Sequence, residues 1–495
     1  MRYFKFNLRK ESLAIILILA VAAILRIYRL SFHDLWYDEI YSIVISGDFW
    51  KNWNPPLYFA ILHYWIKLFG ISEFSLRFPS VIFSVFGVYF TFLLGKLIFN
   101  FRVGIIAAIL MTLSAFCLWY AQEARPYSLS MFLGTVSTYC LFKVLIQKKD
   151  KAWFLFILAA VFLLYSDITY FSFFLLFTQL LIILFIFRKK ISFRIFYCLP
   201  VFLLFLPRLT HFLSKLHSVR EGFWIPIPNL KSMVITIDNF NLGYNSYPAI
   251  YLLSITLSCI VLLRCLFLLK EKKEWIMGIV SMLFLIFLPI LLIFIVSKTF
   301  ITVYLDRGLI TFSPYYYILL ALGLEFFVSN KWFKTTIILA LISCFLIGTY
   351  GYYNDWMVMP LEHHLGTYLK MPFKPAVRFM ENNFRNGDIV TYTNLSSRPS
   401  FEFYQKKNKV GQYFLFYPGM IDYNYNVPFR SGKGNIDTND INITARQRLW
   451  VISCDWPRDG NLDENSNAVK NELDKRYKRE LSLSFDGLWI FRYVK

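Results

Sequence analysis

Long apolar segments with few charges constrain the fold of this chain more than any other feature. A helix that crosses the roughly 30 Å hydrocarbon core of a bilayer needs about 20 apolar residues, and about eleven such segments recur along the chain. The expected spans lie near residues 12–30, 80–99, 104–121, 127–146, 152–166, 169–187, 195–214, 248–269, 276–297, 309–328 and 333–350. We therefore predict a polytopic α-helical membrane protein.

Basic residues set the expected orientation of these spans. The net charge is +21, and much of it lies in short loops such as 148–151, 188–190 and 270–273. Short cytoplasmic loops of membrane proteins carry an excess of Lys and Arg. This pattern predicts a cytoplasmic N-terminus in a plasma or inner membrane and explains the charge without a nucleic-acid partner. An odd number of spans then places the loops 31–79 and 215–247 outside, together with the tail after 351.

The tail, residues 352–495, has the polar composition of a separate domain. We predict a transmembrane domain over 1–351 and an extracytoplasmic α/β domain over 352–495. The expected helices and strands are helices at 373–383 and 467–477, strands at 387–394 and 448–456, and a final hairpin that turns at 486–487. A strand pair around Asp-Gly is a strong hairpin signal. Six of the seven cysteines lie in or beside apolar segments, so we expect no disulfide or cysteine metal site.

The first outer loop contains two adjacent carboxylates, Asp38 and Glu39, in an aromatic-rich amphipathic stretch. Such a stretch is expected to lie on the membrane surface. A partly desolvated carboxylate there is a stronger base than in water. The alternative is that both residues only favour the N-terminal dipole of a helix beginning near Ile40.

Three arginines and one further carboxylate are expected at outer helix ends. Glu123 and Arg125 lie in the short second outer loop, and Arg77 and Arg307 lie beside other spans. Charges at membrane depth usually mark a function, although a solvated pair or a snorkelling arginine is an alternative for each. Because the guanidinium fork suits phosphate, a carboxylate base with nearby arginines suggests transfer from a lipid phosphate.

Four motifs occur in order along this region: LWYDEIYS (35–42), NPPLYF (54–59), EFSLRFPSVIFSVFG (73–87) and YAQEARPYSL (120–129). Together they resemble the dolichyl-phosphate-mannose protein mannosyltransferase-like family of C-type glycosyltransferases. Relatives of that family include the enzyme that adds aminoarabinose to lipid A. The resemblance implies a C-type glycosyltransferase fold over about residues 10–350.

The resemblance also implies roles for individual residues. Asp38 matches the general base of the first loop, Glu39 would orient the acceptor or the base, and Glu123 matches the second-loop acid. The implied donor-phosphate or substrate residues are Arg125, Arg77, Arg307, Asn54 and Tyr127. Asn54 stands where many relatives have histidine or lysine, which puts metal dependence in doubt. Asp167, in LLYSDITYF, falls where relatives often have a Thr-His pair; it is either a site residue or a turn residue, and we favour the turn.

The implied activity is inverting transfer of a sugar from a polyprenyl-phosphate donor to a hydroxyl acceptor at the outer face. The acceptor could be a lipid, a protein or a cell-surface glycan, and the sequence does not choose among them. The residue pattern identifies no metal site and no certain cofactor, so a need for a divalent metal stays open. Three alternatives are a transporter or flippase of lipid-linked sugars, a non-catalytic envelope assembly protein, and a glycan ligase that moves a whole oligosaccharide. The first predicts internal repeats and broken helices at the bilayer midplane.

Overall fold

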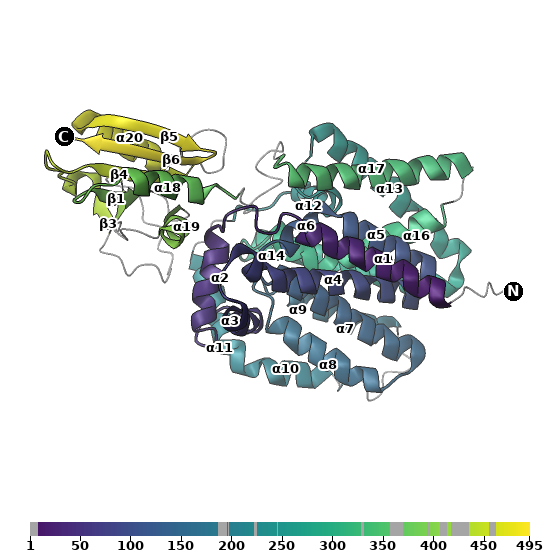
Figure 1. The fold of residues 1–495 in the computed structure, drawn as a ribbon. Coiled ribbons are helices and arrows are strands. Elements are labelled where there is room, and N and C mark those ends of the chain that lie inside the picture. The colour runs from purple at the N-terminus through teal and green to yellow at the C-terminus, as the bar shows by residue number, and fades with distance from the viewer. Residues whose placement is uncertain are drawn as a thin grey trace. The chain divides into compact units, whose positions relative to one another are not determined.

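The structure is a computed structural model of the 495-residue chain. It describes residues 8–186, 196, 198–221, 225–244, 246–327, 331–356, 370–393, 397–405, 413–416, 435–454 and 462–495. The basic run at 188–190 therefore lies outside the described residues. The chain forms two compact units: a membrane unit of Met1–Leu30 and Asp48–Thr367, and a C-terminal unit of Ser31–Gly47 and Tyr368–Lys495 (Figure 1).

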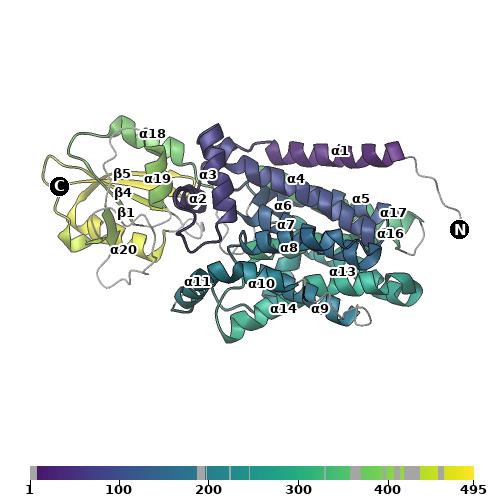
Figure 2. The ribbon, with the colours of Figure 1, turned by 90° about the horizontal axis from the view of Figure 1, so that it is seen from below.

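Helices make up the described part of the membrane unit. Its α-helices are α1 (Leu8–Ile27), α3 (Leu57–Phe69), α4 (Glu73–Ile98), α5 (Phe101–Leu113), α6 (Ala115–Ala121), α7 (Tyr127–Gln147), α8 (Lys151–Leu164), α9 (Ser172–Ile186), α10 (Leu199–Phe205), α11 (Leu209–Glu221), α12 (Leu230–Leu242), α13 (Pro248–Glu271), α14 (Ile276–Thr299), α15 (Asp306–Leu309), α16 (Ser313–Glu325) and α17 (Lys331–Tyr353). Three 3-10 turns join them: η3 (Leu206–Arg208), η4 (Lys273–Trp275) and η5 (Ile310–Phe312). α4 packs along α5 and α7 near the centre of this unit (Figures 1 and 2).

Several of these helices can cross a bilayer. Among the described residues, six helical stretches are long and apolar enough, and the bent pair α5 and α6 makes a seventh if it forms one span. Shorter apolar helices, including α3 and α8, accompany them. The polytopic helical fold class is therefore confirmed, whereas the number of about eleven spans stays a prediction.

The expected span at 104–121 is broken in two. α5 and α6 meet at an angle of 63°. At the break Ser114 has extended backbone, and its hydroxyl accepts a bond of 3.2 Å from the backbone N–H of Cys117. That is the arrangement of a helix N-cap. The same hydroxyl donates to the carbonyl of Phe240 over 3.0 Å, which ties the break to α12.

The LRFPS motif lies inside α4, which begins at Glu73 and not near residue 80. Ser72 caps this helix by accepting from the backbone N–H of Ser75 over 3.1 Å. Pro79 lacks an N–H, so the carbonyl of Ser75, four residues earlier, loses its helical donor. The indole of Trp65 donates to that carbonyl over 2.9 Å. The proline is therefore tolerated within a buried helix.

The C-terminal unit contains a six-stranded mixed sheet with the order β3-β2-β1-β4-β6-β5. The strands are β1 (Ile389–Tyr392), β2 (Tyr413–Phe416), β3 (Asn435–Asp437), β4 (Leu449–Cys454), β5 (Lys478–Phe485) and β6 (Leu488–Val494). β1 to β4 pair in parallel, and β5 and β6 form the antiparallel hairpin expected around 486–487. The helices are α2 (Tyr37–Gly47), α18 (Phe373–Asn383), α19 (Ser397–Tyr404), α20 (Glu464–Arg476) and the 3-10 turn η8 (Thr438–Asp440).

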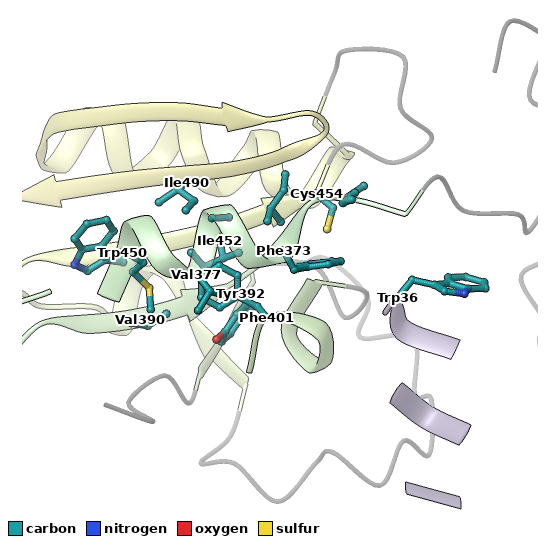
Figure 3. Packing of buried hydrophobic residues seen from close by; sticks show 14 residues of the cluster. Trp36, Phe373, Val377, Val390, Tyr392, Phe401, Trp450, Ile452, Cys454 and Ile490 are labelled. Atoms are coloured by element: carbon teal, nitrogen blue, oxygen red, sulfur yellow. The ribbon is translucent and has the colours of Figure 1, made fainter. Parts of the chain in front are cut away.

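Helices cover both faces of this sheet. Alternate residues of β4 point to opposite faces: Trp450 and Ile452 pack with α18 and α19 in one cluster, and Leu449 and Val451 pack with α20 in another. Trp36, just before α2, belongs to the first cluster (Figure 3). The segment Ser31–Gly47 is thus part of this α/β unit, although it lies more than three hundred residues earlier in the chain.

Candidate functional site

The loop between α6 and α7 carries the EARPY motif, and buried hydrogen bonds fix its conformation. The amide of Gln122 donates to the carbonyls of Arg26 and Tyr28 over 2.9 and 2.8 Å, and it accepts from the Tyr352 hydroxyl over 2.7 Å. Glu123 is 1% exposed, and its Oε1 accepts from the indole of Trp119 over 2.8 Å. This loop therefore has a defined geometry inside the membrane unit.

Two guanidinium groups from distant parts of the membrane unit meet at one aromatic ring. The Arg125 guanidinium carbon lies 5.8 Å from the ring centroid of Tyr127, and that of Arg307 lies 5.9 Å from the same centroid. The ring face attracts both cations, but the two cations repel each other. An anion between them would lower that repulsion, so this arrangement suits a phosphate.

Arg307 owes its position to the residues on either side of it. Asp306 accepts hydrogen bonds from Thr236 over 2.8 Å and from the Asn239 amide over 2.6 Å, both on α12. Burial raises the pKa of Asp306 to about 6, and these two bonds oppose the rise. On the other side, a Cβ on Gly308 would lie 2.7 Å from the side chains of Phe171 and Thr169. Only glycine fits that contact.

A lysine that sequence analysis did not single out joins these arginines. The Lys215 ammonium donates to the carbonyl of Ile168 over 2.6 Å and to Oδ1 of Asn54 over 3.4 Å. It is also close enough to Arg125 and Arg307 to be repelled by both. We call Arg125, Arg307 and Lys215 the cation cluster. A lysine directly after the expected span 195–214, where the expected outer loop begins, was the signal in the sequence that could have identified it.

A buried arginine fixes the loop that contains Asn54. Arg208 is 3% exposed and donates to the carbonyls of Trp50, Asn52 and Asn54 over 2.8–3.0 Å. Oδ1 of Asn52 in turn accepts from the Asn54 amide over 2.8 Å. The position where many relatives have a cation is therefore an asparagine here, and a lysine from α11 contacts it.

The interpretation of Asp167 as a turn residue is confirmed. One carboxylate oxygen accepts from the backbone N–H and the hydroxyl of Thr169 over 2.9 and 2.6 Å, and the other accepts from the Ser172 N–H at the start of α9 over 2.6 Å. The carboxylate also attracts Lys215 electrostatically. Asp167 thus closes the turn and helps to hold the lysine.

Arg77 lies deep inside the membrane unit. It is 1% exposed, and its guanidinium donates to the carbonyl of Leu30 over 2.8 Å. It also interacts electrostatically with Tyr352, as does Glu123. This bond fixes the end of the chain segment that follows α1, and the expected role of Arg77 at the donor phosphate stays a prediction.

Asp38 and Glu39 lie together in the first turn of α2, in the C-terminal unit. They differ in exposure: Asp38 is half-buried, whereas Glu39 is fully buried and its Oε2 lies 3.6 Å from the Lys370 ammonium. Acidic residues in the first turn of a helix also interact favourably with the helix dipole. The alternative that Asp38 and Glu39 only stabilise the start of a helix therefore applies to both. The accessible member of the pair is Asp38.

Among the described residues, no group of three or more His, Cys, Asp and Glu side chains could hold a metal ion. A requirement for a divalent metal stays open, as it did from the sequence.

Comparison with known proteins supports the resemblance found in the motifs. The family model described as dolichyl-phosphate-mannose-protein mannosyltransferase matches residues 53–211. An uncharacterized protein of Aquifex aeolicus is 25% identical over 161 residues, which cover 29% of this chain and 32% of the length of that protein. The resemblance to this family is therefore confirmed.

Solved structures define the fold. ArnT from Cupriavidus metallidurans in the apo state superimposes with a TM-score of 0.58 and 9% identity, over 96% of this chain and 97% of that one. The structure of ArnT bound to undecaprenyl phosphate gives a TM-score of 0.57 and 10% identity over the same shares. The chain is thus a multi-pass membrane protein with the fold of a C-type glycosyltransferase.

Proposed function

We propose that this protein is an inverting glycosyltransferase. It moves a sugar from a polyprenyl-phosphate donor to a hydroxyl acceptor at the outer face of the membrane. The family match over residues 53–211 and the ArnT fold support the reaction class. ArnT has been solved with undecaprenyl phosphate, which supports a donor of this chemical type.

The observation that carries the proposal is the cation cluster. Two guanidinium groups share one tyrosine ring, and an ammonium lies close enough to be repelled by both. Three cations held together in one membrane unit suit a further anion, in addition to the Asp167 carboxylate that attracts Lys215. The phosphate of a polyprenyl lipid supplies that anion beside the bilayer. Tyr127 and Asn54 line the same group of side chains and complete it.

The reaction assigns a part to each carboxylate. Asp38 takes the proton from the acceptor hydroxyl as that oxygen forms a bond to the anomeric carbon. The bond from that carbon to the phosphate oxygen breaks, and the phosphate leaves on its lipid. Arg125 and Arg307 meet the negative charge that develops on it. Glu39 orients Asp38, and Glu123 and Arg77 hold the second outer loop and the end of the first span. One displacement inverts the anomeric configuration.

Binding of the lipid phosphate tests the cluster directly. The double variant Arg125→Gln, Arg307→Gln should bind undecaprenyl phosphate about a hundredfold or more weakly in detergent, since a hydrogen bond to a charged group is worth roughly 1.5–3 kcal/mol. Arg102→Gln is the matched control. Arg102 lies at the beginning of α5, is exposed and forms an ion pair with Glu325 at the end of α16. Equal affinity in the double variant and the wild type would reject the phosphate site.

Transfer must be measured as well. Purified protein in proteoliposomes is supplied with labelled polyprenyl-phosphate hexoses and pentoses and with envelope extract as acceptor. Label should appear on a hydroxyl acceptor, with free polyprenyl phosphate as the second product. Movement of the labelled lipid across the bilayer without transfer would instead support a flippase.

A further inference from the structure

The helix that begins with Asp38 has its packing partners at the other end of the chain. Trp36 is 5% exposed and lies in a cluster with Phe373 of α18, Phe401 of α19 and Trp450 of β4. Figure 3 shows the side chains of this cluster, with Trp36 contributed by the segment that leads into α2. The cluster is the main apolar contact between one face of the sheet and its helices. The segment before α2 is thus part of the core of the C-terminal unit.

A carboxylate of the same segment completes α18. Helix N-termini leave backbone N–H groups without helical acceptors, and the N-cap residue of α18 is Pro372, which makes no side-chain capping bond. Asp34 accepts from the backbone N–H of Lys374 over 2.7 Å and pairs with the Lys374 ammonium at 3.3 Å. The cap of α18 therefore comes from a residue 340 positions away.

The backbone next to Asp34 is fixed too. The N–H of Leu35 donates to the hydroxyl of Tyr404, at the end of α19, over 2.8 Å. The Lys374 ammonium lies 5.2 Å from the ring centroid of that tyrosine. Both ends of this small network belong to the C-terminal unit, and they fix the three residues that precede Tyr37.

A buried ion pair reaches α2 itself. Glu39 and Lys370 form an ion pair at 3.6 Å whose side chains are 0% and 7% exposed. When one partner of a buried ion pair is removed, the other is left as a buried charge at a large cost. Asp38 directly precedes Glu39 in the same helical turn. Any movement that exposes the unpaired charge of Glu39 to water therefore also moves Asp38.

We infer that the α/β unit is the support on which α2 is mounted, and that Lys370 is a positioning residue for Asp38. This inference rests on the proposed function only for the role of Asp38 as base. The tail is accordingly part of the machinery that presents the base, in addition to any contact it makes with an acceptor.

Hydrogen–deuterium exchange of the full-length protein tests the support without any donor. In Lys370→Gln, amides of residues 37–47 should exchange at least tenfold faster than in the wild type, while amides of β6 keep their protection. Lys475→Gln is the matched control, because Lys475 lies on α20 of the same unit and its ion pair with Glu472 is exposed. Exchange of 37–47 within twofold of the wild type in Lys370→Gln would overturn the inference.

Two further variants keep the test decisive. The pair Glu39→Gln, Lys370→Gln removes both charges and should exchange more slowly over 37–47 than Lys370→Gln alone. Tyr404→Phe removes one hydroxyl with little risk to folding, and it should speed exchange near residue 35. If residues 37–47 exchange as fast in the double variant as in Lys370→Gln, the unpaired charge of Glu39 is not the cause of the faster exchange.

The transfer assay then separates positioning from stability. Lys370→Gln should lower kcat about tenfold or more with unchanged affinity for undecaprenyl phosphate, and Lys370→Arg should recover part of the rate. A wild type that transfers no sugar would reject the proposed function, yet the exchange result would still decide whether Lys370 supports α2. An unchanged kcat in Lys370→Gln beside faster exchange would reject the positioning role of Lys370.

Discussion

The loop at 122–127 and the segment Ser31–Gly47 carry the acidic residues that the sequence singles out, Glu123 in the loop and Asp38 and Glu39 in the segment, and the two regions are held in different ways. Glu123 bonds to Trp119, four residues earlier, and the N–H of Arg125 bonds to the carbonyl of Glu123. In contrast, Asp34 and Leu35 bond to residues 340 and 369 positions away. The loop at 122–127 is fixed largely by neighbours within the membrane unit, whereas the segment Ser31–Gly47 is fixed by residues near the far end of the chain.

Two motifs of the same chain can therefore depend on separate units of structure. Changes in the membrane unit should alter binding of the lipid phosphate and leave α2 as it is. Changes in the C-terminal unit should alter the presentation of Asp38 and leave lipid binding as it is. Each expectation can be measured on its own.

The largest effect should come from Asp38→Asn. General-base catalysis contributes roughly 10²–10⁴ in rate, so transfer should fall by about that factor. Affinity for undecaprenyl phosphate should match the wild type, since no phosphate role is assigned to Asp38. Transfer close to the wild-type rate would reject the assignment of the base and would remove one side of the comparison.

Asp238 on α12 gives the next effect, and it is confined to the membrane unit. α12 lies between the spanning stretches Leu199–Arg220 and Pro248–Glu271. Asp238 is 6% exposed, and burial raises its pKa to about 7. A carboxyl held about a thousandfold less acidic than usual costs about 4 kcal/mol when it ionises.

The sign of that pH dependence follows from linkage. Folding raises the pKa of Asp238. Protonated Asp238 therefore stabilises the folded state fully below about pH 4, and this stabilisation is lost as the pH rises through about 7. The melting temperature of the wild type, followed by fluorescence in detergent, should therefore fall between pH 5 and 8. The melting temperature of Asp238→Asn should fall less over the same range. Asp306, whose pKa is about 6, leaves part of the dependence in the variant. Equal pH profiles for both proteins would contradict the prediction.

Lys215→Gln should weaken lipid binding without affecting α2. Loss of one of three cations should weaken undecaprenyl phosphate binding about tenfold, near 1.4 kcal/mol. Exchange of residues 37–47 should not change, since Lys215 belongs to the membrane unit. Lys67→Gln, an exposed lysine on α3, is the control. Unaltered affinity in Lys215→Gln would remove this lysine from the cation cluster.

Ser114→Ala should have the smallest effect. Loss of an N-cap costs about 1 kcal/mol, and for a chain of this size that corresponds to a decrease of about 2 °C or less in melting temperature. Thermal unfolding would measure it, with Ser72→Ala at the start of α4 as a second cap for comparison. Melting equal to the wild type would mean that the bend between α5 and α6 does not depend on this hydroxyl.

Much of the local structure was predictable from the sequence, because local signals determine it. The helix at 373–383 and the hairpin at 486–487 form where the amphipathic pattern and the Asp-Gly turn indicate them. The apolar segments were recognised as helices for the same reason. The break at Ser114 was missed, since one serine in an apolar run is no signal by itself and its partner Phe240 lies on another helix.

The candidate site was predictable only in part. The EARPY and DE motifs identified Glu123, Arg125 and Asp38, and the arginine before Gly308 was recognised at a helix end. Lys215 was missed because its contact with Asn54 depends on how α11 packs. The membership of Ser31–Gly47 in the C-terminal unit was missed because no local pattern reveals an interaction over 340 residues.

The cap that Asp34 provides for α18 also sets a schedule for assembly. Asp34 leaves the ribosome 340 residues before Lys374. At about 5–20 residues per second, the segment that contains Asp34 waits roughly 20–70 seconds for the partner that completes it. During that interval Trp36 has no core to enter, so a chain truncated before residue 370 would keep its spans and present a carboxylate with nothing to hold it in place.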